Sequence, residues 1–207
     1  METLFVNALA RRAVLAVILV ASPMGPALAE AAAVPPGFTM SRTGDVHDFD
    51  YFAGGWTTAQ HKLKSRGTGS HDWDDFPGTL CMTPYLGGAA TVDELWFPTK
   101  GTAGLTLRTF DPARRQWSIY WVNSQLGKLD PVPTVGGFSG DRGEFYALDT
   151  DNGRPVKVRY LWNKIDRDHA RWEQAFSYDD RDWETNWTAD FTRGDPAALC
   201  RNGQPKR

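Results

Sequence analysis

The chain has 207 residues and a formal net charge of −2, with 23 lysines and arginines against 25 aspartates and glutamates. These charges are interspersed and form no basic stripe, which excludes the class of proteins that track nucleic-acid phosphates. Hydrophobic residues make up 41% of the chain, enough for a single domain with a substantial core.

The first 29 residues have the layout of a secretory signal peptide. Arg11 and Arg12 precede an apolar run over residues 13–21, and a small-residue cleavage site ends at Ala29. The run is too short to anchor the chain across a bilayer, so we expect an exported, periplasmic or secreted protein without a membrane span. The mature chain is expected to begin near Glu30, followed by an Ala- and Pro-rich flexible linker over residues 30–44.

From residue 45 onward, short segments of period-two alternation are separated by turn signals, after a short helical turn expected over 45–52. The expected strands cover residues 57–66, 72–84, 89–98, 103–111, 115–123, 132–139, 143–149, 155–164, 169–178 and 182–193. Short connections favour an antiparallel meander, and closing it into a barrel removes its edge strands. The sequence therefore predicts an all-β fold, a single antiparallel up-and-down barrel of about ten strands over 45–194 with a C-terminal tail over 195–207. A two-sheet sandwich is the competing architecture.

Nine tryptophans in one small domain exceed what a minimal packed core needs, so they are expected to fill a wide barrel or line a cavity. We assign the more apolar face of each strand to the interior, which places Leu105 and Leu107 inside and Thr106 and Arg108 outside. The candidate ligand-binding residues on this basis are Trp96, Trp117, Trp121, Tyr160, Trp162, Trp172, Gln174, Phe176, Thr185 and Trp187.

Two of these candidates are polar. Gln174 and Thr185 share predicted inner faces with tryptophans, so they could orient a ligand by hydrogen bonds or bond each other across the strands. We expect Tyr160 to act in the same way.

Glu94 and His61 are the weak candidates for catalysis. Glu94 alternates with Trp96, and a desolvated carboxyl among aromatic rings could act as a general acid or base. The alternative places Asp93 and Leu95 inside and leaves Glu94 in water. His61 falls on an apolar face, where a lone histidine is more often a core residue than a catalyst.

Gly54, Gly55 and Trp56, at the entrance to the first predicted strand, resemble the Gly-x-Trp signature of lipocalins and related calycin barrels. In that family the tryptophan closes one end of the barrel and an arginine near the last strand stacks across it. The resemblance therefore implies barrel closure by Trp56 and Arg193, with a cation–π contact between them.

Residues 47–193 also resemble an uncharacterised bacterial family of secreted, lipocalin-like barrels, through the segments HDFDYFAGGW, WSIYW and RWEQAFSYDDRDWETNW. That family supplies no established reaction. The predicted number of strands is similar to that of the nitrobindin-type haem barrel. The resemblance to the nitrobindin-type barrel would imply a haem, although the haem-ligating histidine of that barrel has no clear match here.

Cys81 and Cys200 could pair in an oxidising compartment and pin the C-terminal tail, or remain as a buried thiol and a free one. His71 precedes several aspartates within 72–75, but without the repeat spacing of a metal site. A charged loop is expected there, and no metal site is predicted.

No nucleophile elbow, phosphate loop or dinucleotide fingerprint occurs in the chain. The leading hypothesis is an exported β-barrel that binds a small apolar or aromatic molecule in a tryptophan-lined cavity. The alternative is an acid/base barrel enzyme, an isomerase, cyclase or hydrolase, which uses Glu94 or His61 on a small hydrophobic substrate. A third hypothesis is an interaction or envelope protein with a packed core, and the oligomeric state is left open.

Overall fold

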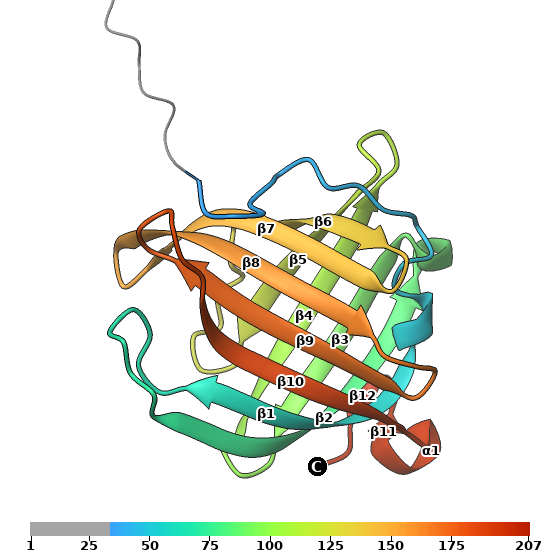
Figure 1. The fold of residues 1–207 in the computed structure, drawn as a ribbon. Coiled ribbons are helices and arrows are strands. Elements are labelled where there is room, and N and C mark those ends of the chain that lie inside the picture. Colours follow the sequence, from blue (N-terminus) through green and yellow to red (C-terminus); the bar gives the residue numbers. More distant parts are fainter. Residues whose placement is uncertain (1–33) are drawn as a thin grey trace, which may run out of the picture. The chain divides into compact units, whose positions relative to one another are not determined.

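The computed structural model describes residues 34–207, in which ten strands close into one antiparallel barrel (Figure 1). The strands are β1 Gly54–Leu63, β2 Trp73–Tyr85, β3 Ala90–Phe97, β4 Thr102–Asp111, β5 Gln116–Asn123, β6 Thr134–Ser139, β7 Arg142–Asp151, β8 Arg154–Lys164, β9 His169–Ser177 and β10 Glu184–Gly194. Each strand pairs with its neighbours in the chain, and β1 also pairs with β10. The predicted up-and-down barrel is confirmed and the sandwich is excluded. The predicted signal peptide lies outside the described residues.

Local sequence chemistry sets several of the turns. Asn152 and Gly153 both have positive φ, at 51° and 80°, as a two-residue hairpin loop between β7 and β8 requires. In the β4–β5 turn, the Asp111 carboxylate accepts hydrogen bonds from the backbone amides of Ala113 and Arg114 at 2.9 and 3.1 Å. These turns hold consecutive strands in antiparallel register.

An aromatic plug, composed of Phe49, Phe52 and Trp56, fills one end of the barrel. Phe52 belongs to a short 3-10 helix, Asp50–Phe52, and all three side chains are almost completely buried. The Trp56 indole donates a hydrogen bond to the Phe52 carbonyl at 2.9 Å, which ties the helix to the start of β1. In Figure 1 this end lies beside the short helix α1.

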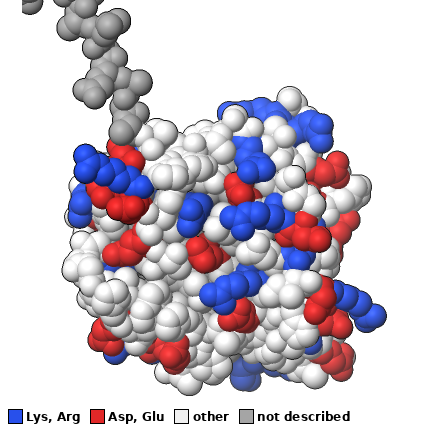
Figure 2. Space-filling view, viewed as in Figure 1, with Lys and Arg blue, Asp and Glu red and all other residues white. Residues whose placement is uncertain are grey.

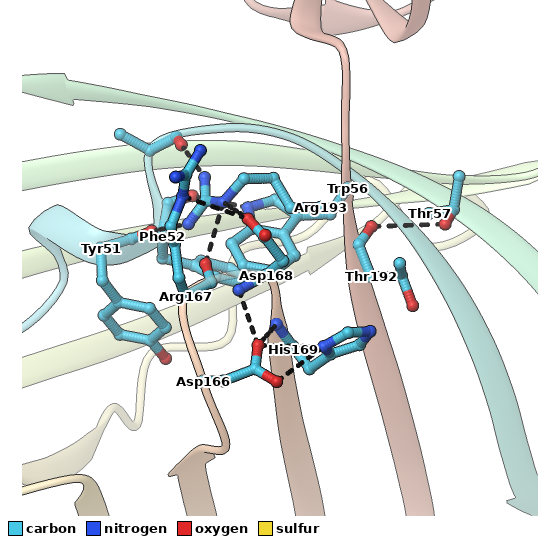
Figure 3. A network of polar contacts seen from close by, with 11 residues as sticks. Tyr51, Phe52, Trp56, Thr57, Asp166, Arg167, Asp168, His169, Thr192 and Arg193 are labelled. Carbon is cyan, nitrogen blue, oxygen red and sulfur yellow. Dashed lines mark hydrogen bonds and ion pairs between the residues drawn. The ribbon is translucent and has the colours of Figure 1, made fainter.

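Arg193, near the end of β10, covers the plug from outside (Figure 3). Its guanidinium lies 4.1 Å from the centre of the Trp56 ring. The same group donates hydrogen bonds to the carbonyls of Tyr51 and Ala53, the latter at 3.0 Å. One side chain therefore joins the last strand of the barrel to the segment that leads into the first.

Residues 34–44, which the sequence assigns to a linker, lie along the outside of the barrel above β7 (Figure 1). The Trp183 indole donates to the Pro36 carbonyl at 2.7 Å, and the Gln116 amide donates to the Arg42 carbonyl at 2.8 Å. Arg42 also forms an ion pair with Glu144 at 2.6 Å. From Val34 on, this segment is held against the barrel wall.

The C-terminal residues form a small structure of their own against the barrel. They comprise the helix α1 (Pro196–Leu199) and a hairpin of β11 (Cys200–Arg201) and β12 (Gln204–Pro205), which lies against β2 and β3. A disulfide joins Cys81 in β2 to Cys200, with their Cα atoms 6.0 Å apart. The pairing that the sequence left open is thus present. Within residues 34–207, no helix is long and apolar enough to cross a bilayer.

Opposite charges alternate on the outer surface of β8, β9 and β10. Arg159 pairs with Glu173 at 3.4 Å, and Arg171 pairs with Asp190 at 2.6 Å, each across neighbouring strands. Figure 2 shows basic and acidic side chains interspersed over the face of the molecule that it draws.

Reducing the disulfide should lower the free energy of unfolding, because the bond closes a loop of 119 residues and so limits the unfolded chain. We expect a loss of about 2–4 kcal/mol in urea denaturation with a thiol reductant present. The double variant Cys81→Ala, Cys200→Ala should unfold at the same urea concentration with and without reductant. Equal stability of oxidised and reduced wild-type protein would contradict the prediction.

Candidate functional site

A cavity of about 380 Å³ lies inside the barrel, between the aromatic plug and the opposite end. Near the plug it is lined by Trp162 and Phe191, whose rings contact Phe52 at 4.9 and 5.2 Å between centroids. At the other end it reaches Arg66, after β1, and Leu126, in the connection between β5 and β6. Its walls are the inward-facing residues of the strands, because successive side chains point to opposite faces.

One wall of the cavity is aromatic. Tyr160 and Trp172 pack edge to face at 5.1 Å, Trp172 meets Trp187 at 5.5 Å, and Trp187 meets Trp121 at 6.2 Å. The Trp187 indole also donates a hydrogen bond of 2.8 Å to the Gln60 side-chain oxygen. The ring at the centre of this wall is therefore fixed in orientation.

Gly104 in β4 makes room for one of these rings. A Cβ atom added at this position would lie 1.8 Å from the Trp121 ring. The absence of a side chain lets the indole of β5 lie directly against the backbone of β4.

The wall formed by β3 and β4 is polar. Asp93 and Arg108 are 1% and 2% exposed, line the cavity and form an ion pair with each other. They are placed together by the register of the hairpin, in which Asp93 lies opposite Thr106 and Arg108 opposite Thr91. The Arg108 guanidinium lies 4.8 Å from the Phe49 ring, so the pair stands between the plug and the cavity.

Charged groups surround the end of the cavity farthest from the plug. The Lys62 ammonium lies 3.9 Å from the centre of the Trp187 ring, and burial lowers the pKa of this amine, as does the nearby Arg66. Across the cavity, burial raises the pKa of the Asp149 carboxyl, and Asp130 raises it further. Burial also raises the pKa of the Tyr160 phenol, so this group stays neutral.

Seven of the ten predicted ligand-binding residues line the cavity. They are Trp121, Tyr160, Trp162, Trp172, Gln174, Phe176 and Trp187. The structure places them together, and their role in ligand binding stays a prediction.

The other three predicted residues lie elsewhere. Trp117 is buried against the plug, 5.1 Å from the Phe49 ring, and its indole donates to a backbone carbonyl. Trp96 is on the outer face of β3, with the Arg207 guanidinium 4.5 Å from its ring. Thr185 also faces outward and donates a hydrogen bond to Glu173.

A β-bulge explains the position of Thr185. The register between β9 and β10 shifts between Thr185 and Trp187, so the alternation of inward and outward side chains is interrupted there. Asn186 is completely buried and accepts a hydrogen bond from the Gln174 amide at 2.7 Å. The partner of Gln174 inside the barrel is therefore Asn186 rather than Thr185.

Both weak catalytic candidates lie outside the cavity. Glu94 pairs with Arg207 on the outer face of β3, while Asp93 and Leu95 line the interior, as in the alternative that the sequence left open. His61 stacks on Trp73 at 4.1 Å on the outer face of β1. In β1 and β3 the inward face is the more polar of the two. The rule that assigns the more apolar face to the interior is therefore wrong for these strands.

Sequence reasoning missed Arg108, Gln60 and Lys62 as cavity residues, and it placed Asp93 inside only in its alternative. Leu105 and Leu107 turn outward, so the prediction that β4 faces inward with its leucines is wrong. The short turn between β3 and β4 was a usable signal. It sets which residues of the two strands lie opposite each other, and this register puts Asp93 and Arg108 on the same face of the hairpin.

The cavity offers no histidine to a haem. Among residues 34–207, its lining contains none of the four histidines of the chain, so a histidine-ligated haem like that of the nitrobindin-type barrel does not fit. Within the same described residues, no group of three or more His, Cys, Asp or Glu side chains is arranged to hold a metal ion.

Comparisons with known proteins leave the family undetermined. No family model matches the chain, and no curated protein matches it. Among solved structures, a redesigned β-barrel matches with a TM-score of 0.41 and 10% identity, over 74% of this chain and 100% of that one. This likeness is too weak to carry an argument, and the resemblance to lipocalins stays a prediction.

Lys62→Met should raise the free energy of unfolding at neutral pH, because it removes an ammonium whose burial disfavours its charge. The folded-state pKa of Lys62 lies below its unfolded value of 10.5, so the unfolded chain binds more protons between these two values. Wild-type stability should therefore rise with pH in that window relative to the variant, so that the gain from the substitution disappears.

Urea denaturation at a series of pH values measures this difference. Lys64→Met is the matched control, because Lys64 is exposed and its hydrogen bond to Asp72 raises the pKa of its amine. That control should show no gain at neutral pH. A Lys62→Met protein less stable than wild type at neutral pH would contradict the assignment.

Proposed function

We propose that the protein is an exported, lipocalin-like β-barrel that binds a small apolar or aromatic molecule in its tryptophan-lined cavity. The observation that carries this proposal is the cavity itself, a space of about 380 Å³ that the barrel side chains leave unfilled. Its size lies in the range of small-molecule sites, which are about 300–1,000 Å³.

The aromatic wall supports binding by burial and stacking. Trp121, Trp172 and Trp187 present rings to the cavity, and their edge-to-face contacts hold them in place before a ligand arrives. A preorganised wall loses little side-chain entropy on binding. Gln174 and Tyr160 add polar groups that can orient the bound molecule.

The competing functions have less support. An acid/base enzyme that uses Glu94 or His61 would need these groups beside the substrate, whereas both face away from the cavity. An interaction protein with a packed core would have no use for a cavity of this size.

Two separate features favour export. The signal-peptide pattern of residues 1–29 is one, and the disulfide between Cys81 and Cys200 is the other, since disulfides persist in oxidising compartments. We propose a periplasmic or secreted location. Intact-mass measurement of the protein expressed in its native host should then give a chain that begins near Glu30. A soluble cytoplasmic protein that retains Met1 would remove the proposal of export.

Trp187→Leu should weaken the binding of an apolar aromatic probe, because Trp187 is the central ring of the wall. We expect a loss of about five- to tenfold in affinity for N-phenyl-naphthylamine, followed by probe fluorescence. Trp96→Leu is the matched control, since it removes a tryptophan from the outer face and should leave the affinity unchanged. Failure of the wild-type protein to bind this probe or any other apolar aromatic compound would exclude the proposed function.

A further inference from the structure

The polar wall of the cavity contains two buried atoms without a partner. Among residues 34–207, neither the second carboxylate oxygen of Asp93 (Oδ1) nor the Nε of Arg108 has a hydrogen-bond partner. Both residues line the cavity. Buried polar groups are nearly always hydrogen-bonded, so a free acceptor and a free donor on adjacent strands point to a missing partner.

The protein holds this pair in a fixed position. Arg108 donates through one terminal nitrogen to Asp93 Oδ2 and, at 3.4 Å, to the Thr91 hydroxyl. Three rings surround its guanidinium, that of Phe49 at 4.8 Å and those of Phe52 and Trp162 at 5.8 Å. The unpaired atoms therefore belong to side chains with little freedom to find other partners.

The charges of the pair decide what kind of group can bind. The positive guanidinium is already offset by the Asp93 carboxylate, so an anion placed here would meet Asp93 without a spare positive charge to balance it. An isolated cation would meet Arg108 in the same way. A neutral group that donates one hydrogen bond and accepts another adds no net charge to the buried site.

We propose that Asp93 and Arg108 form the recognition site for a neutral amide-type group of the ligand. The N–H of this group donates to the Asp93 carboxylate and its carbonyl accepts from the Arg108 guanidinium. The apolar or aromatic remainder lies against Trp172 and Trp187, on the other wall of the same cavity. This inference rests on the proposed function and specifies its ligand as an aromatic or apolar amide rather than a carboxylate.

The test compares three probes that share one naphthalene ring system: naphthamide, methyl naphthoate and naphthoate. The amide donates and accepts, the ester only accepts, and the carboxylate is an anion at neutral pH. Isothermal titration of the full, disulfide-bonded protein should give an affinity for naphthamide at least about tenfold above that for either other probe.

Two variants attribute the preference to the pair. The double variant Asp93→Leu, Arg108→Met replaces the ion pair by apolar side chains, an exchange that buried pairs often tolerate. It should bind naphthamide and methyl naphthoate within about threefold of each other, and naphthoate most weakly, because the anion would be buried without a positive partner. Asp93→Asn leaves the guanidinium charge unbalanced, so naphthoate should become the preferred probe. Glu94→Gln removes the neighbouring outward carboxylate and is the matched control, with the wild-type ranking retained.

The outcomes distinguish a failure of this inference from a failure of the proposed function. If wild-type protein binds the three probes equally, or prefers naphthoate, the cavity still binds aromatic molecules but the recognition site is wrong. A double variant that still prefers naphthamide to methyl naphthoate overturns the assignment in the same way. If N-phenyl-naphthylamine binds but none of these three probes does, this inference fails and the proposed function stands. If neither N-phenyl-naphthylamine nor any of the three probes binds, both fail. The wild-type ranking needs no variant, so a substitution that prevents folding does not remove the test.

Discussion

The closure of β1 onto β10 is the constraint on which the rest of the molecule depends. It pairs Trp56 with Arg193 in register and leaves the barrel without an exposed edge. Roughly eight strands enclose an interior that side chains can just fill, and the diameter grows with strand number. A ten-stranded barrel therefore has more interior than its own side chains occupy. Here the plug fills one end and the cavity takes up what remains.

The plug and the polar wall are parts of one arrangement. Phe49 reaches into the barrel and packs on the Arg108 guanidinium. The neighbouring Asp48 carboxylate accepts hydrogen bonds from the backbone amides of Asp45 and Phe138, at 2.9 and 3.2 Å, which fixes the segment that carries the ring. A molecule that forms a hydrogen bond with Arg108 would thus lie against the aromatic plug that closes this end of the barrel. The depth of the cavity and the stability of the closed end are therefore linked.

Much of the fold could be predicted from the sequence, because period-two alternation and turn residues are local signals. They give the ten strands within a few residues, the Asn152–Gly153 turn and the antiparallel order. The inward faces of β5 and β8 also follow, since Trp121 and Tyr160 stand on clearly apolar faces. The face of β10 could not be followed across the bulge before Trp187, because one extra residue in a strand has no local signature.

The inward faces of β1, β3 and β4 could not be predicted by the same rule, because alternation gives two faces without telling which one points into the barrel. For β3 the structure supplies a reason. The C-terminal hairpin lies against β2 and β3, and its disulfide meets the outer side chain of Cys81. Arg207 covers Trp96 on the same side. Apolar residues on this part of the barrel can therefore face outward and still be shielded from water. The neighbouring residues that point inward can then be polar. Asp93, on the inward face of β3, is one of them. The cover over the outer face of β2 and β3 thus comes from a tail that lies more than 100 residues further along the chain, as the separation of 119 residues between Cys81 and Cys200 shows.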